Sequence, residues 1–234
     1  MIIAFCPVWG RHKILRVWAE GIIRLRDMVD ITPVLIVSSL EDSDFIKNYI
    51  EPLLPDTVTV FTNNQPLGNK QNKGLQAIRD MDWDYLCQIS SDLLLTDKGM
   101  EELLDNPTDV TGFSMAYFIN TVDGVSILFK KLSGQKSLGA CRMISRDVIH
   151  RCNYTLWNDS FHNNLDRSSQ ERMGDVDMKV IDKPLVVGIK SDIQITPFKI
   201  LHDLADEVDT NKAISGLGES EIEMINNLIN EKWN

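Results

Sequence analysis

The sequence has few of the features that mark several common protein classes. Its four cysteines, Cys6, Cys87, Cys141 and Cys152, form no C-x-x-C pair. We therefore expect small buried side chains in a reducing compartment, not a disulfide framework or a zinc site. No apolar run is long enough to cross a bilayer, and the first one stops at Pro7, too early for a signal peptide. These absences predict a cytoplasmic protein with no transmembrane segment.

Basic residues are also scarce relative to acidic ones. The 234-residue chain has 24 Lys and Arg against 34 Asp and Glu, which gives a formal net charge of −10. Broad binding to duplex DNA relies on basic residues that neutralise phosphates, so this class is disfavoured, whereas a local basic cleft is not. With 43% hydrophobic residues, the chain can bury a sizeable core. We expect a single domain over 1–234, divided into two unequal halves, 1–95 and 96–234.

The first half alternates between short apolar runs and amphipathic segments. The apolar runs predict strands at 2–6, 34–37, 58–61 and 85–89. The segments between them predict helices at 12–28, 45–50 and 70–80. Such alternation with short loops indicates an α/β fold of the Rossmann type, with a mostly parallel sheet and helices on both faces.

The second half changes character. Its apolar runs are shorter and are separated by polar stretches, so we expect a smaller, mixed arrangement of strands, among them 140–144 and 185–189. Near the end, Ser220 and Glu223 have the spacing of a capping box and predict the start of a final helix.

Polar clusters follow the strands of the first half. They lie at 7–11, 38–44, 63–73 and 90–92. Ligands of parallel sheets bind at the carboxyl ends of the strands, so these clusters are expected to share one site. The lysines and amides of 69–73 suit a phosphorylated ligand.

One cluster also supplies a carboxylate. Mg²⁺ and Mn²⁺ prefer carboxylate oxygens and share their coordination with phosphate and water, so Asp92 alone can dock a metal-diphosphate. Its structural alternative is to cap the turn that follows. Lys70 and Lys73 can face the diphosphate as point charges, or can lie on a solvated helical turn. We expect only one of the two to point inward.

The second half offers candidates for the acceptor side. Transfer of a sugar with inversion needs a general base near the acceptor hydroxyl, and a carboxylate in a partly closed cleft suits that task. Asp166 is the candidate base, with helix capping as its alternative. Trp157 and Asp159 are candidate acceptor-binding residues. His202 is a candidate second metal ligand, with a surface position as the alternative.

Taken in order, four pieces of the sequence resemble the GT-A fold of nucleotide-diphospho-sugar transferases, especially the family-two-like glycosyltransferases. They are PVWGR at 7–11, SS at 38–39 before acidic residues, LGNKQNKGL at 67–75 leading to SSD at 90–92, and GACRMISR at 139–146 before Asp166. The resemblance implies that Asp92, with His202, holds a divalent metal (Mn²⁺ or Mg²⁺) and that Asp166 is the base. The first acid of the family's metal motif is Ser90 here. The residues expected to bind the nucleotide-sugar are Pro7, Trp9, Arg11, Ser39, Lys70, Lys73, Ser91 and Asp92.

The resulting prediction is an inverting glycosyltransferase that moves a sugar from a nucleotide-diphospho-sugar, with UDP-sugar favoured, to an acceptor hydroxyl. The acceptor can be a glycan or another hydroxyl compound. A modified base of DNA stays open, although the acidic charge gives it no support. Two alternatives remain: a sugar-phosphate nucleotidyltransferase, which usually has a glycine-rich loop after its first strand, and a non-catalytic nucleotide-sugar-binding module.

Overall fold

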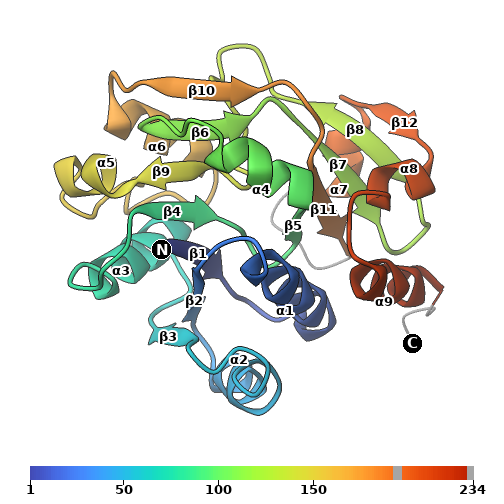
Figure 1. Cartoon of the computed structure of the whole chain (residues 1–234), viewed down its shortest axis with the longest axis horizontal. Helices are drawn as coiled ribbons and strands as arrows, with labels where there is room; N and C mark the ends of the chain where they lie inside the picture. The colour runs from blue at the N-terminus through green and yellow to red at the C-terminus, as the bar shows by residue number, and fades with distance from the viewer. Residues whose placement is uncertain (192–196, 231–234) are drawn as a thin grey trace.

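A computed structural model describes residues 1–191 and 197–230 and contains two sheets within those residues (Figure 1). The larger sheet has the strand order β10 (Met178–Ile181), β6 (Val110–Phe113), β9 (Met143–Ser145), β4 (Tyr85–Gln88), β1 (Ile2–Pro7), β2 (Ile31–Val37) and β3 (Val58–Phe61). Its pairs are parallel except around β9, which runs antiparallel to both β4 and β6. The α/β class and the mostly parallel sheet are therefore confirmed.

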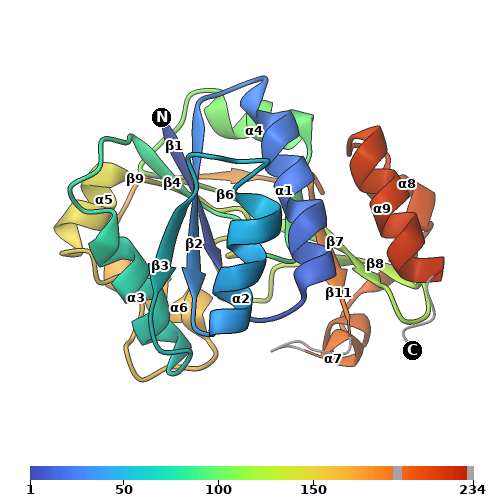
Figure 2. The ribbon, with the colours of Figure 1, turned by 90° about the horizontal axis from the view of Figure 1, so that it is seen from below.

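Helices cover both faces of the larger sheet (Figure 2). On one face lie α1 (His12–Arg26), α2 (Leu40–Phe45), the π-helical turn η1 (Ile46–Ile50) and α4 (Asp97–Leu104). On the other lie α3 (Leu67–Ala77), α5 (Arg146–Arg151) and α6 (Leu165–Met173). Strand β1 shows why its sequence is a continuous apolar run: Ala4 and Cys6 face the first group, and Ile3 and Phe5 face the second.

The smaller sheet is mixed, as expected for the second half. Its order is β12 (Asp206–Val208), β8 (Ser126–Lys130), β7 (Met115–Asn120), β11 (Val186–Lys190) and β5 (Leu93–Leu95). Helices α8 (Thr210–Ile214) and α9 (Glu219–Asn230) pack on it, and α7 (Phe198–His202) lies beside β8. The division of the chain into one domain with two unequal halves stays a prediction.

In the second half, two boundaries differ from the sequence prediction for local reasons. The strand expected at 140–144 is β9, which begins at Met143 because Cys141 adopts a left-handed conformation with a φ of 53° that ends any extended run before it. The final helix, α9, begins at Glu219 and not after Ser220. Its start is satisfied by the Glu221 carboxylate, which accepts a hydrogen bond from the Gly218 N–H at 2.9 Å.

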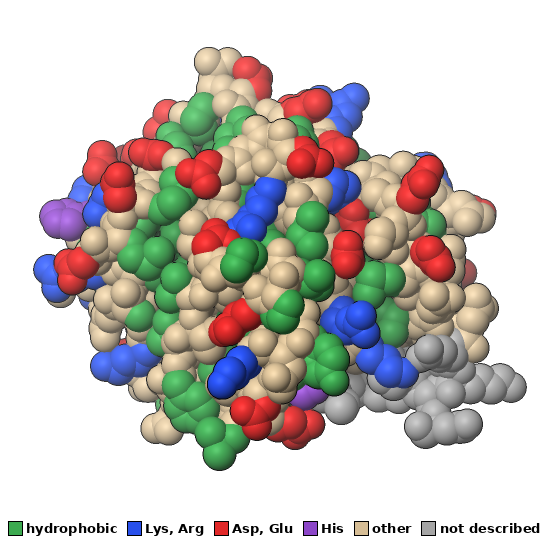
Figure 3. Space-filling view, turned by 60° about the horizontal axis from the view of Figure 1, so that its bottom comes forward, with side chains coloured by type: hydrophobic (Ala, Val, Ile, Leu, Met, Phe, Trp, Pro, Cys, Tyr) green, Lys and Arg blue, Asp and Glu red, His purple; other side chains and the backbone are tan. Residues whose placement is uncertain are grey.

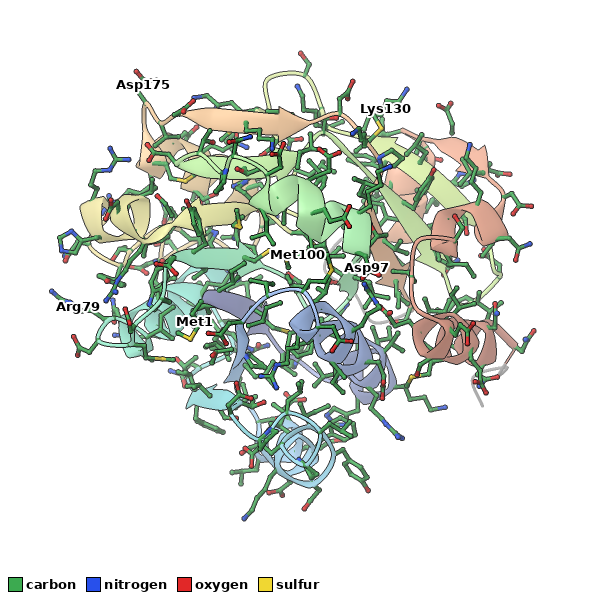
Figure 4. All side chains as sticks on the ribbon, viewed as in Figure 1. Met1, Arg79, Asp97, Met100, Lys130 and Asp175 are labelled. Atoms are coloured by element: carbon green, nitrogen blue, oxygen red, sulfur yellow. The ribbon has the colours of Figure 1, made fainter. Side chains whose placement is uncertain are left out.

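A buried ion pair ties α9 to the body of the molecule. Arg24 of α1 donates to both carboxylate oxygens of Glu221, at 2.5 and 3.1 Å, and Glu221 is only 2% exposed. The same guanidinium reaches Asp97 at the start of α4, which is labelled in Figure 4, and the carbonyl of Leu95. Arg24 therefore joins three helices, and its charge is structural, not part of a ligand site.

Helix α3 holds the polar loop that follows α5. Helix α3 begins at Leu67, three residues before the predicted start. The residues before position 70, which were expected to form a loop, are therefore the first turn of this helix. Asn72, which is 1% exposed, accepts hydrogen bonds from the N–H groups of Leu156 and Trp157 and donates to the carbonyl of Trp157 and to Asp159. Gly68 completes the contact, because a Cβ there would lie 2.0 Å from the carbonyl oxygen of Asn158. The loop at 156–161 is thereby fixed against α3.

Replacing Asn72 tests this attachment. In Asn72→Ala, two buried backbone N–H groups lose their acceptor, so we expect the free energy of unfolding to fall by about 2–3 kcal/mol in a chemical denaturation experiment. Asn69→Ala, at a half-buried position on the same helix, is the control and is expected to change it by less than about 0.5 kcal/mol. Equal effects of the two substitutions would contradict the role assigned to Asn72.

Candidate functional site

A cleft of about 560 Å³ opens where β1 and β4 end. Parts of the chain that are distant in sequence line it: the loop after β1, the start of α3, the end of β4, the start of α6 and the end of β11. Of the residues predicted for the site, it brings together Pro7, Trp9, Arg11, Lys70, Asp92, Trp157 and Asp166.

Asp92 lies at the centre of a buried charge cluster. Its Oδ2 accepts hydrogen bonds from Arg11 Nη1 at 3.0 Å and from Lys190 Nζ at 2.9 Å. Arg11 Nη2 also donates to the hydroxyl of Ser91 at 2.9 Å. Burial alone would raise the pKa of the Asp92 carboxyl, but the charges of Lys190 and Arg11 outweigh burial and hold that pKa well below its ordinary value. Asp92 is therefore ionised across the working pH range of proteins.

The turn after β1 aims Arg11 at Asp92. Gly10 and Arg11 both have positive φ, 59° and 55°, so the chain reverses sharply between β1 and α1. The Gly10 N–H donates to Asp42 Oδ1 at 2.9 Å, so helix α2, which follows the neighbouring strand β2, fixes the turn. Because few residues other than glycine adopt this conformation, Arg11 is held there by its partners.

Lys70 points inward and Lys73 does not. Lys70 is 1% exposed, and its Nζ donates to the carbonyl of Val8 at 2.5 Å and to Asn64 Oδ1 at 3.1 Å. Burial lowers the pKa of this ammonium to about 8, against the opposing effects of Asp42 and Cys6. Lys73 is exposed and contacts Gln76.

Three helices begin at the cleft without a side-chain cap. They are α1, α3 and α6, whose first turns or preceding residues line it. The helices α2, α4, α5 and α8 are capped, by Ser39, Thr96, Ser145 and Asp209. A first turn without a side-chain cap can offer N–H groups to a ligand, and the helix dipole places partial positive charge there. In α3 one of these groups is already used, because the Gly68 N–H donates to the carbonyl of Phe161 at 2.9 Å. Together with Arg11, Lys70 and Lys190, these ends make the cleft suited to an anion.

Asp166 lies on the side of the cleft formed by α6. Its Oδ2 accepts a hydrogen bond from the Gly139 N–H at 3.0 Å. A Cβ at position 139 would lie 1.8 Å from Oδ1, so glycine is the residue that leaves room for this carboxylate. A fully buried arginine supports the arrangement: Arg142 donates to the hydroxyls of Ser137 and Ser169, and Ser169 belongs to α6.

The predicted acceptor-side residues and the remaining candidates differ in where they lie. Trp157 lines the cleft, but it is almost fully buried and stacks on Phe5, with 5.8 Å between ring centroids. Ser39 caps α2 and Asp159 accepts from Asn72, and neither lines the cleft. His202 is on α7, where it pairs with Glu207 at 2.7 Å, also outside the cleft.

Lys190 is a functional candidate that the sequence analysis missed. It ends β11, so the rule that drew attention to polar residues after the strands of the first half also applies to it. Gln88, at the end of β4, is a second omission. Its buried Oε1 finds no hydrogen-bond partner within the described part of the chain, and the residue lines the cleft.

The residues at Asp92 do not fit a divalent metal site. Two cations share its Oδ2, and its neighbours in the expected motif, Ser90 and Ser91, carry no charge. Over residues 1–191 and 197–230, no group of three or more His, Cys, Asp or Glu side chains could hold a metal. His202, the expected second ligand, is engaged by Glu207 elsewhere.

On the face that Figure 3 shows, acidic and basic side chains are intermixed. No helix in the described part of the chain has the length and apolar character of a membrane span.

Comparison with known proteins identifies the fold. No protein-family model and no curated protein matches the sequence. Among solved structures, S. aureus TarS 1–349 in complex with UDP matches with a TM-score of 0.57 at 10% identity, over 100% of this chain and 70% of the other. Another structure of TarS 1–349 gives a TM-score of 0.55 at 10% identity, and the match covers 80% of this chain and 60% of the TarS chain. In that match, this chain spans less than two thirds of the length of TarS 1–349.

Two further structures match over most of this chain. The mannosyltransferase PcManGT from Pyrobaculum calidifontis, in complex with GDP-Man and Mn²⁺, gives a TM-score of 0.52 at 11% identity, with 97% and 73% of the two chains covered. The inositol-1-phosphate CTP transferase of T. maritima gives 0.54 at 12% identity, with 98% and 96% covered. At such low identity the likeness concerns the fold alone, and the chain has a GT-A-like α/β fold.

Proposed function

We propose that the protein is a glycosyltransferase that uses a nucleotide-diphospho-sugar, with UDP-sugar favoured, and transfers the sugar to an acceptor hydroxyl with inversion. The observation that carries the proposal is the convergence of Arg11, Lys70 and Lys190 with three uncapped helix ends in one cleft of a protein whose net charge is −10. Such an arrangement selects an anion with several charges, and a diphosphate meets that description.

The fold neighbours support this choice of donor. Two of them were solved with UDP and with GDP-Man. In this chain, Pro7 ends β1, Trp9 follows it, and both line the cleft. The exposed indole of Trp9 offers a stacking surface for a base or a sugar ring. The diphosphate then lies toward Arg11, Lys70 and Lys190, and the sugar toward Trp157 and Asp166.

Asp166 is the general base in this proposal. The acceptor oxygen attacks the anomeric carbon, the bond from that carbon to the diphosphate oxygen breaks with its electron pair leaving on the diphosphate, and the hydroxyl proton passes to Asp166. The hydrogen bond from Gly139 holds one carboxylate oxygen at a fixed orientation, so the other can face the acceptor.

Substituting Asp166 separates this role from donor binding. Asp166→Asn keeps the shape and the Gly139 contact but cannot take the proton, so we expect transfer to slow by about 10²-fold or more. Donor affinity, measured by calorimetry, is expected to stay within about threefold of the wild type.

Glu171→Gln is the matched control for that experiment. It removes a carboxylate from the exposed side of the same helix, where Glu171 pairs with Arg167, and is expected to leave transfer unchanged. Normal transfer by Asp166→Asn would contradict the assignment of the base.

A sugar-phosphate nucleotidyltransferase is the second candidate, because the T. maritima CTP transferase matches nearly the whole of both chains. The turn after β1 has one glycine, Gly10, where that class usually has a glycine-rich loop, which favours the first candidate. The assay is release of pyrophosphate from a nucleoside triphosphate and a sugar phosphate. Release at a rate above that of donor hydrolysis would favour the second candidate, and donor binding with neither reaction would favour a non-catalytic binding module.

The buried ammonium of Lys70 gives the site a pH dependence. A diphosphate is bound more tightly beside a charged lysine, and the pKa of Lys70 is about 8 in the free protein. Affinity for the donor should therefore be constant below that pH and fall as pH rises through it, by at most about tenfold per unit. Calorimetric titrations between about pH 7 and pH 9 measure this effect.

Two lysine variants on α3 make that measurement specific. Lys70→Met should bind the donor more weakly and lose the pH dependence, whereas Lys73→Met removes an exposed charge from the same helix and should behave as the wild type. A wild-type affinity that does not change across this pH range would contradict the assigned contact.

A further inference from the structure

We propose that Arg11 and Lys190, held in place by Asp92, neutralise the donor diphosphate in place of a divalent metal. The inference rests on the proposed function and concerns how the same cleft handles negative charge. Its basis is that the one carboxylate at the expected metal position is already the anchor of two cations, with Oδ2 at 3.0 Å from Arg11 and 2.9 Å from Lys190.

The cluster has a net positive charge, which repels a metal ion and attracts a phosphate. Arg11, Lys190 and Asp92 sum to one positive charge, and Lys70 adds a second at the same cleft. A divalent ion at Asp92 would lie beside two fixed cations with about 11–15% side-chain exposure, where repulsion between like charges is poorly screened. A diphosphate has the opposite charge and gains from the same surroundings.

Both cations are preorganised. Arg11 also donates to Ser91, so its guanidinium plane is fixed by two partners, and a guanidinium has five N–H donors of which these contacts use two. The remaining donors can form the paired hydrogen bonds that arginine makes with phosphate oxygens. Lys190 lies over the ring of Phe118, with its Nζ 5.1 Å from the ring centroid, which limits its freedom further.

The backbone fixes the same geometry. The carbonyl of Asp92 accepts a hydrogen bond from the Ile189 N–H at 2.7 Å, directly before Lys190. The strand end that presents the carboxylate and the strand end that presents the ammonium are therefore bonded to each other. During transfer, the electron pair of the broken bond ends on the diphosphate oxygen next to these cations, so the charge that develops there meets groups already in position.

The test measures binding of three probes, UDP, GDP and inorganic pyrophosphate, by calorimetry in EDTA and in excess Mn²⁺. The wild type is expected to bind at least one of them in EDTA, with an affinity that Mn²⁺ changes by less than about threefold. Lys190→Met and Arg11→Met should each weaken binding by about 10–100-fold, since each removes a charge-assisted hydrogen bond to the phosphate. Lys183→Met, at an exposed lysine outside the cleft, should have no effect.

Asp92→Asn distinguishes an Asp92 that binds a metal from an Asp92 that anchors two cations. If Asp92 binds a metal, the variant loses the increase in affinity that Mn²⁺ produces. If Asp92 anchors two cations, the variant keeps metal-independent binding, because an amide oxygen can still accept hydrogen bonds from Arg11 and Lys190 and the cleft gains a positive charge. Lys190→Arg, which retains the charge, should recover most of the binding that Lys190→Met loses. Thermal unfolding of each variant shows whether a loss of binding comes from a loss of fold.

The outcomes also separate this inference from the proposed function. Binding that requires Mn²⁺, or normal binding by Lys190→Met, would overturn the cationic site even if a nucleotide-sugar is the donor. Metal-independent binding of pyrophosphate without UDP or GDP would support the cationic site and contradict the proposed donors. Failure of all three probes to bind would overturn both.

Discussion

The ionised carboxylate of Asp92 is the constraint on which the rest of the site depends. Its Oδ2 draws Arg11 from the turn after β1 and Lys190 from the end of β11, and its carbonyl bonds the N–H of Ile189. These contacts join the larger sheet to the smaller one at the point where the cleft opens. A buried carboxylate left with no partner is strongly destabilising, so the two cations are required by the fold before any ligand arrives. The same requirement places two phosphate-binding groups in fixed positions.

The helices also differ in whether a side chain caps their first turn. Helices α2, α4, α5 and α8 satisfy their first turns with Ser39, Thr96, Ser145 and Asp209, and are complete within the protein. Helices α1, α3 and α6 begin at the cleft without a side-chain cap, as α7 does outside it. At the cleft, the carbonyl of Phe161 takes up the Gly68 N–H of α3, and a ligand can engage the first-turn groups that remain. In a chain with a net charge of −10, the three cations and the helix ends that meet in one cleft favour a small polyanion over a long nucleic acid.

The sequence predicted what depends on local pattern. The buried strands were recognisable because residues such as Ile3 and Ala4 face opposite helix layers, and Arg11 and Asp92 because they follow such strands. What depends on distant partners was not readable. Lys190 meets Asp92 across 98 residues, and Asn72 meets Trp157 across 85. Ser39 was predicted as a ligand contact because it follows a strand, but its hydroxyl caps helix α2. A polar residue after a strand can therefore have a purely structural role.

Hydrogen exchange with and without nucleotide-diphospho-sugars shows whether these donors bind in the cleft. Because bound phosphates engage the uncapped first turns, amides at 8–12, 67–71 and 164–168 should exchange more slowly with the cognate donor present. The capped start of α4 should be unaffected and provides an internal reference. Protection confined to another part of the surface, such as the pocket of Arg79, Arg146 and Tyr154, or no protection by any nucleotide-sugar, would show that the cleft is not the donor site.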